Sequence, residues 1–181
     1  MIRAFGDRVP KIHPTAFVSE AAYVVGDVEI GEGSSIWPGV IIRANIKKIT
    51  IGKHVNIQDN CVLHNDSDAV YGDYVTLGHH VICHAAKVEE NCLIGNGATV
   101  NGDAVIGHHS IVAAGSVVLE RVEIPPHSFV VGAPGSVRGE TTGRHLEMIE
   151  RVARSYEQNG VLFKEAGLGD PDQANFTIDE T

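Results

Sequence analysis

Residues 88–130 read VEENCLIGNGATVNGDAVIGHHSIVAAGSVVLERVEIPPHSFV, and every sixth residue of this stretch is a branched aliphatic one. The eight positions are Val88, Ile94, Val100, Ile106, Val112, Val118, Ile124 and Val130. A period of six matches neither the 3.6-residue turn of an α-helix nor the plain alternation of a β-strand. It is typical of short strands joined by tight corners, so this stretch predicts a β-solenoid.

The same spacing extends back to the N-terminus after small shifts of register. Large residues recur at Ile12, Val18, Val24, Ile30, Ile36, Ile42, Ile51, Ile57, Leu63, Tyr71, Leu77 and Cys83. Three such six-residue sides make a rung of 18 residues, with the large side chains stacked inside and neighbouring rungs paired as parallel strands. We therefore expect an all-β solenoid, a parallel β-helix, over residues 1–135. A sandwich of short strands fits less well, because its hairpins would vary the spacing.

Three irregularities interrupt the repeat. The steps are nine residues from Ile42 to Ile51, eight from Leu63 to Tyr71, and five from Cys83 to Val88. Extra residues in a solenoid emerge as loops at a corner and leave the stack intact, and such loops are often where function is placed.

The chain changes character after the last repeat. Residues 136–166 contain a segment with apolar residues on one helical face, which Thr141 or Thr142 could cap, so we expect an α-helix packed outside the solenoid. Residues 167–181 are polar and acidic, and we expect them to form a flexible tail.

Composition limits the function classes. Of the 181 residues, 43% are apolar, yet no apolar run approaches the roughly 18 residues that would cross a membrane. The opening residues show no signal peptide, so we expect a cytoplasmic protein. The net charge of -9 disfavours nucleic acid and anionic lipid as partners. Three cysteines are too few for a disulfide framework and are interpreted as reduced core thiols.

The register of the histidines separates one pair from the rest. His64 and His84 each follow a core position, and the 20-residue step from one to the other equals one rung of 18 residues plus the two extra loop residues. Their imidazoles are therefore predicted to lie one rung apart on the same side, as two ligands of one metal would. His79 lies on a different side of the rung, so it could reach that metal only from a neighbouring subunit.

Three imidazoles suit a zinc centre whose fourth position is left for water, and a symmetric trimer would then hold three such sites. Five other histidines are interpreted as tolerated surface residues because they share no register that indicates a site: His13, His54, His108, His109 and His127. His145 is assigned to the helix surface, and the role of His80 is left open.

Several motifs together resemble the gamma-class carbonic anhydrase family. They are HPTAFV, IWPGVIIRANI, ITIGKHVNIQDNCVLH, VTLGHHVICHA, IGNGATV and FVVGAPGSVRG, which cover about four fifths of the chain. The resemblance implies a left-handed β-helix with a C-terminal helix, assembled as a homotrimer. It also implies metal ligation by His64, His79 and His84, with His79 donated across the interface, and reversible hydration of CO2 to bicarbonate.

The resemblance assigns roles to four further residues. Arg43 and Asp59 match an ion pair between subunits, and Gln58 matches a glutamine that hydrogen-bonds the metal-bound hydroxide or bicarbonate. Tyr156 resembles a helix tyrosine that leans into the site. Zinc is the expected metal, although three imidazoles also accept cobalt or ferrous iron.

The chain departs from the family in three ways. The family usually has Arg-Gly-Asp where this chain has Arg43-Ala44-Asn45, the loop after His64 is short, and His80 replaces a glycine. Asp66, Asp68 and His80 are the candidate proton carriers. Two alternatives stay open: a metal-binding trimer with a structural or interaction role and little activity, and a hexapeptide-repeat acyltransferase or thioesterase that acts on a coenzyme A thioester.

Overall fold

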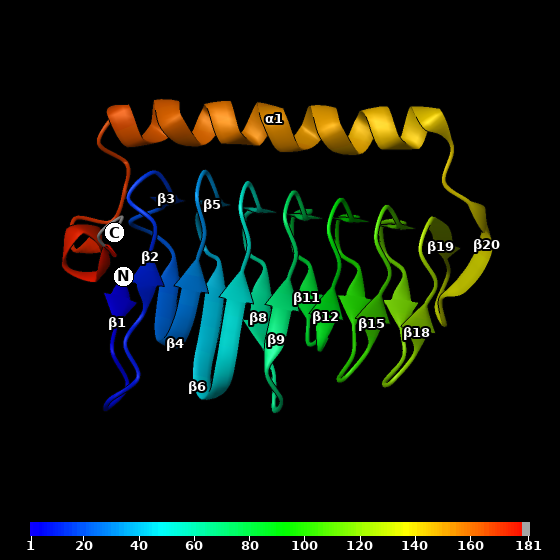
Figure 1. The fold of residues 1–181 in the computed structure, drawn as a ribbon, viewed down its shortest axis with the longest axis horizontal. Coiled ribbons are helices and arrows are strands. Elements are labelled where there is room, and N and C mark those ends of the chain that lie inside the picture. The colour runs from blue at the N-terminus through cyan, green and yellow to red at the C-terminus, as the bar shows by residue number, and fades with distance from the viewer. Residues whose placement is uncertain (179–181) are drawn as a thin grey trace.

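The structure is a computed structural model that describes residues 1–178. The chain winds into a long parallel β-helix, and one long α-helix, α1 (Gly143–Glu165), runs along its outside (Figure 1). The predicted left-handed β-helix with an external C-terminal helix is confirmed. Among these residues, no helix is long and apolar enough to span a membrane.

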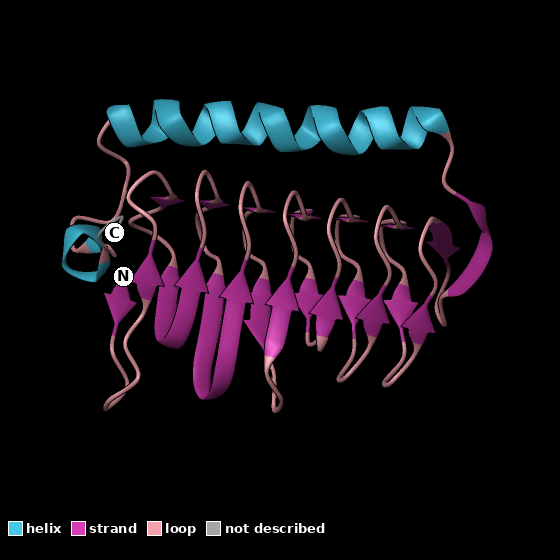
Figure 2. Cartoon of the chain, in the orientation of Figure 1, coloured by secondary structure: helices cyan, strands magenta, loops and turns pink. Residues whose placement is uncertain are grey.

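Short strands form the sides of the β-helix (Figure 2). One sheet contains β1 (Ile2–Arg3), β2 (Lys11–Ile12), β4 (Tyr23–Ile30), β6 (Ile41–Ile51), β8 (Val62–His64), β9 (Ala69–Tyr71), β11 (Ile82–Cys83), β12 (Lys87–Val88), β14 (Thr99–Val100), β15 (Val105–Ile106), β17 (Val117–Val118) and β18 (Glu123–Ile124). The other contains β3 (Phe17–Val18), β5 (Ser35–Ile36), β7 (Asn56–Ile57), β10 (Thr76–Leu77), β13 (Leu93–Ile94), β16 (Ile111–Val112), β19 (Ser128–Val131) and β20 (Ser136–Glu140).

The six-residue ladder forms the core. Each of the twenty ladder positions is at most 6% exposed, including the two exceptions to the aliphatic rule, Tyr71 and Cys83. In residues 88–130, where the repeat is uninterrupted, strands pair with the strands one rung away along the chain. Ile94, for example, lies opposite Val112. Burial raises the pKa of the Cys61 and Cys92 thiols to about 12, which keeps them protonated and unreactive.

The β-helix has three sides that differ in their outward-facing residues. The helix-covered side carries the column Phe17, Ser35, Asn56, Thr76, Leu93, Ile111 and Phe129. The charged side carries Lys11, Glu29, Thr50, Val70, Lys87, Val105 and Glu123. The uncharged side carries Tyr23, Ile41, Val62, Ile82, Thr99 and Val117. Tyr23, Ile41 and Ile82 are 39–50% exposed, so no segment within residues 1–178 covers the uncharged side.

Aromatic packing anchors α1 to the helix-covered side. Trp37 contacts Tyr156 and Phe163 edge-on, with ring centroids 5.4 and 4.9 Å apart, and Phe17 packs against the same cluster. The helix starts at Gly143 directly after Thr142, one of the two predicted caps, and residues 136–140 pair before it as β20 against β19.

The segment after α1 differs from the expected flexible tail over the part that the structure describes. Residues 173–176 form a short 3₁₀ helix, and Gln173 Nε2 donates to the Ala16 carbonyl over 2.8 Å. The buried Asp170 carboxylate pairs with the N-terminal ammonium of Met1. This segment covers the first rung, whose open end would otherwise expose the core. Residues 179–181, which the same prediction included, lie outside the described part.

We expect Gly95→Ala to lower the free energy of unfolding by about 1–3 kcal/mol, a typical cost of overpacking. A Cβ at Gly95 would lie 2.5 Å from the backbone nitrogen of Ala114 in the next rung. Gly143→Ala is the matched control, because among the described residues no atom outside its chain neighbours and the adjacent helix backbone lies within 4 Å of the added methyl group. Urea denaturation at one fixed protein concentration measures both, and equal midpoints would contradict the expected clash.

Candidate metal centre

Two of the predicted ligands lie side by side on one chain. His64 ends β8 and His84 follows β11, and these strands pair with Leu63 opposite Cys83. The two imidazole rings are 5.3 Å apart between centroids and nearly perpendicular. A cavity of about 430 Å³ opens beside His84 and is also lined by Asp66 and Ile82.

His79 lies across the uncharged side from His84, at the other edge of that side. It occupies the corner between β10 and β11, and β11 crosses the uncharged side before the chain reaches His84. Within residues 1–178, these three histidines do not form a group of donors within reach of one cation. One chain therefore presents two candidate half-sites, one at each edge of the uncharged side.

Backbone and carboxylate contacts fix the tautomers of two of these histidines. His64 Nδ1 lies 2.8 Å from the Arg43 carbonyl oxygen, and His79 Nδ1 lies 3.0 Å from Asp59 Oδ2. Because both partners can only accept, each Nδ1 carries the hydrogen and donates it. In the neutral imidazole, Nε2 then keeps its lone pair, which is how a metal-ligating imidazole is usually held.

Arg43 does not pair with Asp59 in this chain. Its Nη1 donates to Asn45 Oδ1 over 2.6 Å, while the Asp59 carboxylate is engaged with His79. Arg43 and His64 are register partners on β6 and β8, so Arg43 belongs to the half-site of His64 and His84. Asp59 belongs to the other half-site.

Gln58 and Tyr156 lie on the His79 side of the molecule. Gln58 directly follows β7 and is only 5% exposed. The side-chain amide of Asn56, two residues earlier, and the hydroxyl of its register partner Thr76 are buried without a hydrogen-bond partner among the described residues. Burial, together with the Asp59 carboxylate, raises the pKa of Tyr156.

The two aspartates in the loop after His64 make different contacts. Asp66 is exposed and its Oδ1 lies 3.8 Å from His64 Nε2. Asp68 Oδ1 instead accepts a hydrogen bond from the Lys48 amide over 3.1 Å, so it holds the neighbouring rung. His80 is exposed at the same corner as His79.

The structure brings together three of the five histidines that were interpreted as tolerated surface residues. The donor atoms of His108, His109 and His127 all lie within 4.8 Å of one another. The missed signal was the 18-residue step from His109 to His127, one full rung. The pKa of His109 lies below its ordinary value because burial and the two neighbouring histidines disfavour its charged form. His54, another of the five, contacts Glu157 and stacks on Tyr74.

Comparison with known proteins identifies relatives named as carbonic anhydrases. A carbonic anhydrase of Geobacillus kaustophilus is 38% identical over 91% of this chain and 91% of its own. The mitochondrial gamma carbonic anhydrase 2 of Arabidopsis thaliana is 37% identical over 83% of this chain, which spans only 57% of that longer protein.

Solved structures support the fold and add a second functional description. A Bacillus cereus protein described as a putative acetyltransferase superposes with a TM-score of 0.86 at 34% identity, covering 90% of this chain and 96% of its own. The family pattern described as bacterial transferase hexapeptide (six repeats) matches residues 85–120.

Proposed function

Because the chain belongs to the hexapeptide-repeat family that includes the gamma carbonic anhydrases, we propose that it catalyses the reversible hydration of carbon dioxide. In this proposal the active sites are metal centres between the subunits of a homotrimer. Each centre combines His64 and His84 of one chain with His79 of the next.

The observation that carries the proposal is the fixed tautomer of His64 and His79. Two imidazoles at opposite edges of the uncharged side are each held with Nε2 available, one by the Arg43 carbonyl and one by Asp59. A surface histidine without a function needs no such support. The donor set of three imidazoles fits zinc, and it also accepts cobalt or ferrous iron.

The three sides of the β-helix favour a particular trimer. One side is covered by α1 and one carries charges of both signs, while the uncharged side exposes an apolar column. If three uncharged sides face a common axis, the His79 edge of one chain meets the His64 and His84 edge of its neighbour. The same packing would bring Arg43 close to Asp59 of the adjacent chain, which accounts for their separation within one chain.

Each residue then has a defined task in the reaction. A divalent cation at this centre would lower the pKa of water and supply a nucleophile for carbon dioxide near neutral pH. Gln58, almost buried on the His79 half-site, orients the substrate and the bicarbonate product by hydrogen bonds. Asp59 orients His79, and Tyr156 closes the site from α1. Asp66, close to His64 Nε2, is the best-placed group to move a proton to solvent.

Stopped-flow measurement of CO2 hydration by zinc-loaded protein, with metal content measured on the same sample, tests the proposal. We expect about one ion per chain at the shared sites and a hydration rate that rises with buffer concentration, because proton removal limits turnover. We further expect Asp66→Asn to slow the reaction at low buffer and to be rescued by added imidazole. Full occupancy of these sites without a rate above background would contradict catalysis and leave a metal-binding structural trimer.

A second candidate function is acyl transfer from coenzyme A. It is favoured by the likeness to the structure described as a putative acetyltransferase. Calorimetric titration with coenzyme A separates the two, because the hydration proposal expects no binding.

The three free, buried cysteines fit a reducing compartment, which supports a cytoplasmic location.

A further inference from the structure

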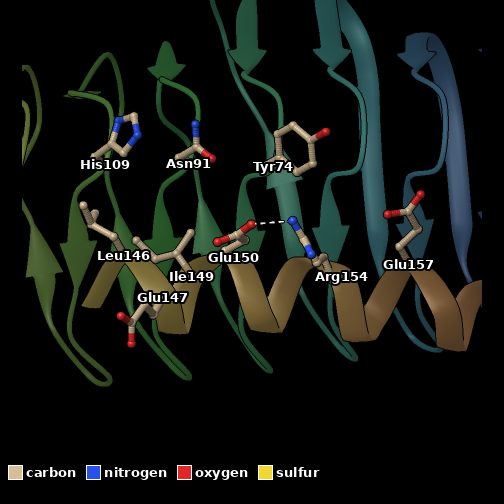
Figure 3. A pocket seen from close by; sticks show the side chains of 9 residues that line it. All are labelled: Tyr74, Asn91, His109, Leu146, Glu147, Ile149, Glu150, Arg154 and Glu157. Carbon is tan, nitrogen blue, oxygen red and sulfur yellow. Dashed lines mark hydrogen bonds and ion pairs between the residues drawn. The ribbon is translucent and has the colours of Figure 1, made fainter. Parts of the chain in front are cut away.

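One corner of the β-helix is built from side chains in an uncommon backbone conformation. His54, Tyr74, Asn91, His109 and His127 occupy the same turn in successive rungs, all with φ between 54° and 59°. Non-glycine residues rarely adopt this region. Figure 3 shows Tyr74, Asn91 and His109 in a row along α1, with His109 at one end of a groove of about 430 Å³.

The last two turns of this column bring three imidazoles together. His108 and His127 each have ring centroids 5.1 Å from that of His109, and the His109 and His127 rings stack at 21°. His108 Nδ1 and His109 Nδ1 are 2.9 Å apart. The His127 amide donates to the His108 carbonyl over 2.9 Å, so the backbone holds the two turns in this relation.

The donor spacing is close to what a transition metal needs. Two nitrogens bound to a tetrahedral zinc ion at about 2.0–2.1 Å lie about 3.3 Å apart. The observed nitrogens, 2.9 Å apart for one pair and within 4.8 Å for all three, reach this spacing by small rotations of the rings. His127 is exposed and therefore free to make the larger adjustment.

We propose that His108, His109 and His127 form a second metal site, which binds a divalent transition-metal ion of the zinc class. All three ligands come from one chain, so this site does not depend on the trimer or on the proposed hydration centre. Imidazole donors without carboxylate favour zinc, nickel or copper over magnesium or calcium.

The position of the cluster indicates a structural role for the ion. The Thr141 amide donates to the His127 carbonyl over 2.7 Å, and Thr141 Oγ1 donates to the His109 carbonyl over 3.0 Å. Thr141 immediately precedes the cap of α1, so both turns that hold the start of the helix carry ligands. A bound ion would join two consecutive rungs and fix the attachment of α1.

The test uses a His64→Ala/His84→Ala protein, which lacks the ligands of the proposed hydration centre. After chelation and dialysis against zinc, we expect about one ion per chain by elemental analysis and a higher melting temperature than in the metal-free form. Hydrogen exchange of the Thr141 amide should slow when zinc is added. Activity is not a readout, so failure of the hydration proposal leaves this result interpretable.

Three further variants in the same background locate the ion. His109→Asn and His127→Asn should each lose the zinc and its effect on melting, and asparagine tolerates the positive φ at both positions. His54→Asn is the matched control, because it has the same conformation in the same column and should keep the ion. Absence of zinc from the parent double variant, or its retention by both His109→Asn and His127→Asn, would overturn the proposal.

Discussion

Mixing His79→Ala chains with His64→Ala chains is expected to restore CO2 hydration that neither variant shows alone. In the proposed arrangement, each homotrimer of one variant lacks a ligand at every site. In a mixed trimer, one interface joins an intact His64 and His84 pair to an intact His79. Random assembly from equal amounts then rebuilds about a quarter of the sites, because three quarters of the trimers are mixed and each holds one complete site in three.

The experiment requires unfolding and refolding the two chains together so that subunits exchange, followed by stopped-flow assay. Two controls bracket it: each variant refolded alone, and wild-type protein taken through the same procedure. A further mixture, His64→Ala with His84→Ala, should stay inactive, because both substitutions damage the same half-site and no interface is complete. Recovery in that mixture, or none in the first, would contradict a centre shared between chains.

Ile82→Asp is expected to convert the proposed trimer to monomers and to abolish activity while the fold survives. Ile82 is 50% exposed at the centre of the uncharged side, so an aspartate is tolerated in a single chain. At the threefold axis it would bury three unpaired carboxylates, each of which costs several kcal/mol. Light scattering after size exclusion measures the mass, and far-ultraviolet circular dichroism checks the fold.

Val70→Asp is the matched control for this substitution. Val70 is 42% exposed, but it lies on the charged side next to Lys87, which pairs with it in register. We expect this variant to remain trimeric and active. A trimeric Ile82→Asp protein, or a Val70→Asp protein that dissociates, would show that the chains associate through another side.

The solenoid was predictable because its core is one-dimensional. A residue such as Ile106 contacts its equivalents one rung before and one rung after, so a fixed spacing in sequence becomes a fixed stack in space. The same arithmetic placed His64 beside His84 and His79 at another corner. His109 and His127 obey the same 18-residue step, and the adjacent His108 completes their cluster.

The six-residue repeat could not predict the contacts at the ends of the solenoid. The repeat describes neighbours within the stack, whereas the segment after α1 returns to the first rung and places Asp170 beside Met1. Hydrogen bonds such as Asp59 with His79 also depend on side-chain direction at a corner, where the six-residue period carries no information.

The sequence by itself determined the β-helix, the external helix and the pairing of His64 with His84, since each follows from spacing along the chain. Only the tertiary structure decided which side is left uncovered, which nitrogen each imidazole leaves available, and that three further histidines converge at one corner. Those properties arise where residues from different rungs and from α1 meet, and their geometry is set by packing in three dimensions.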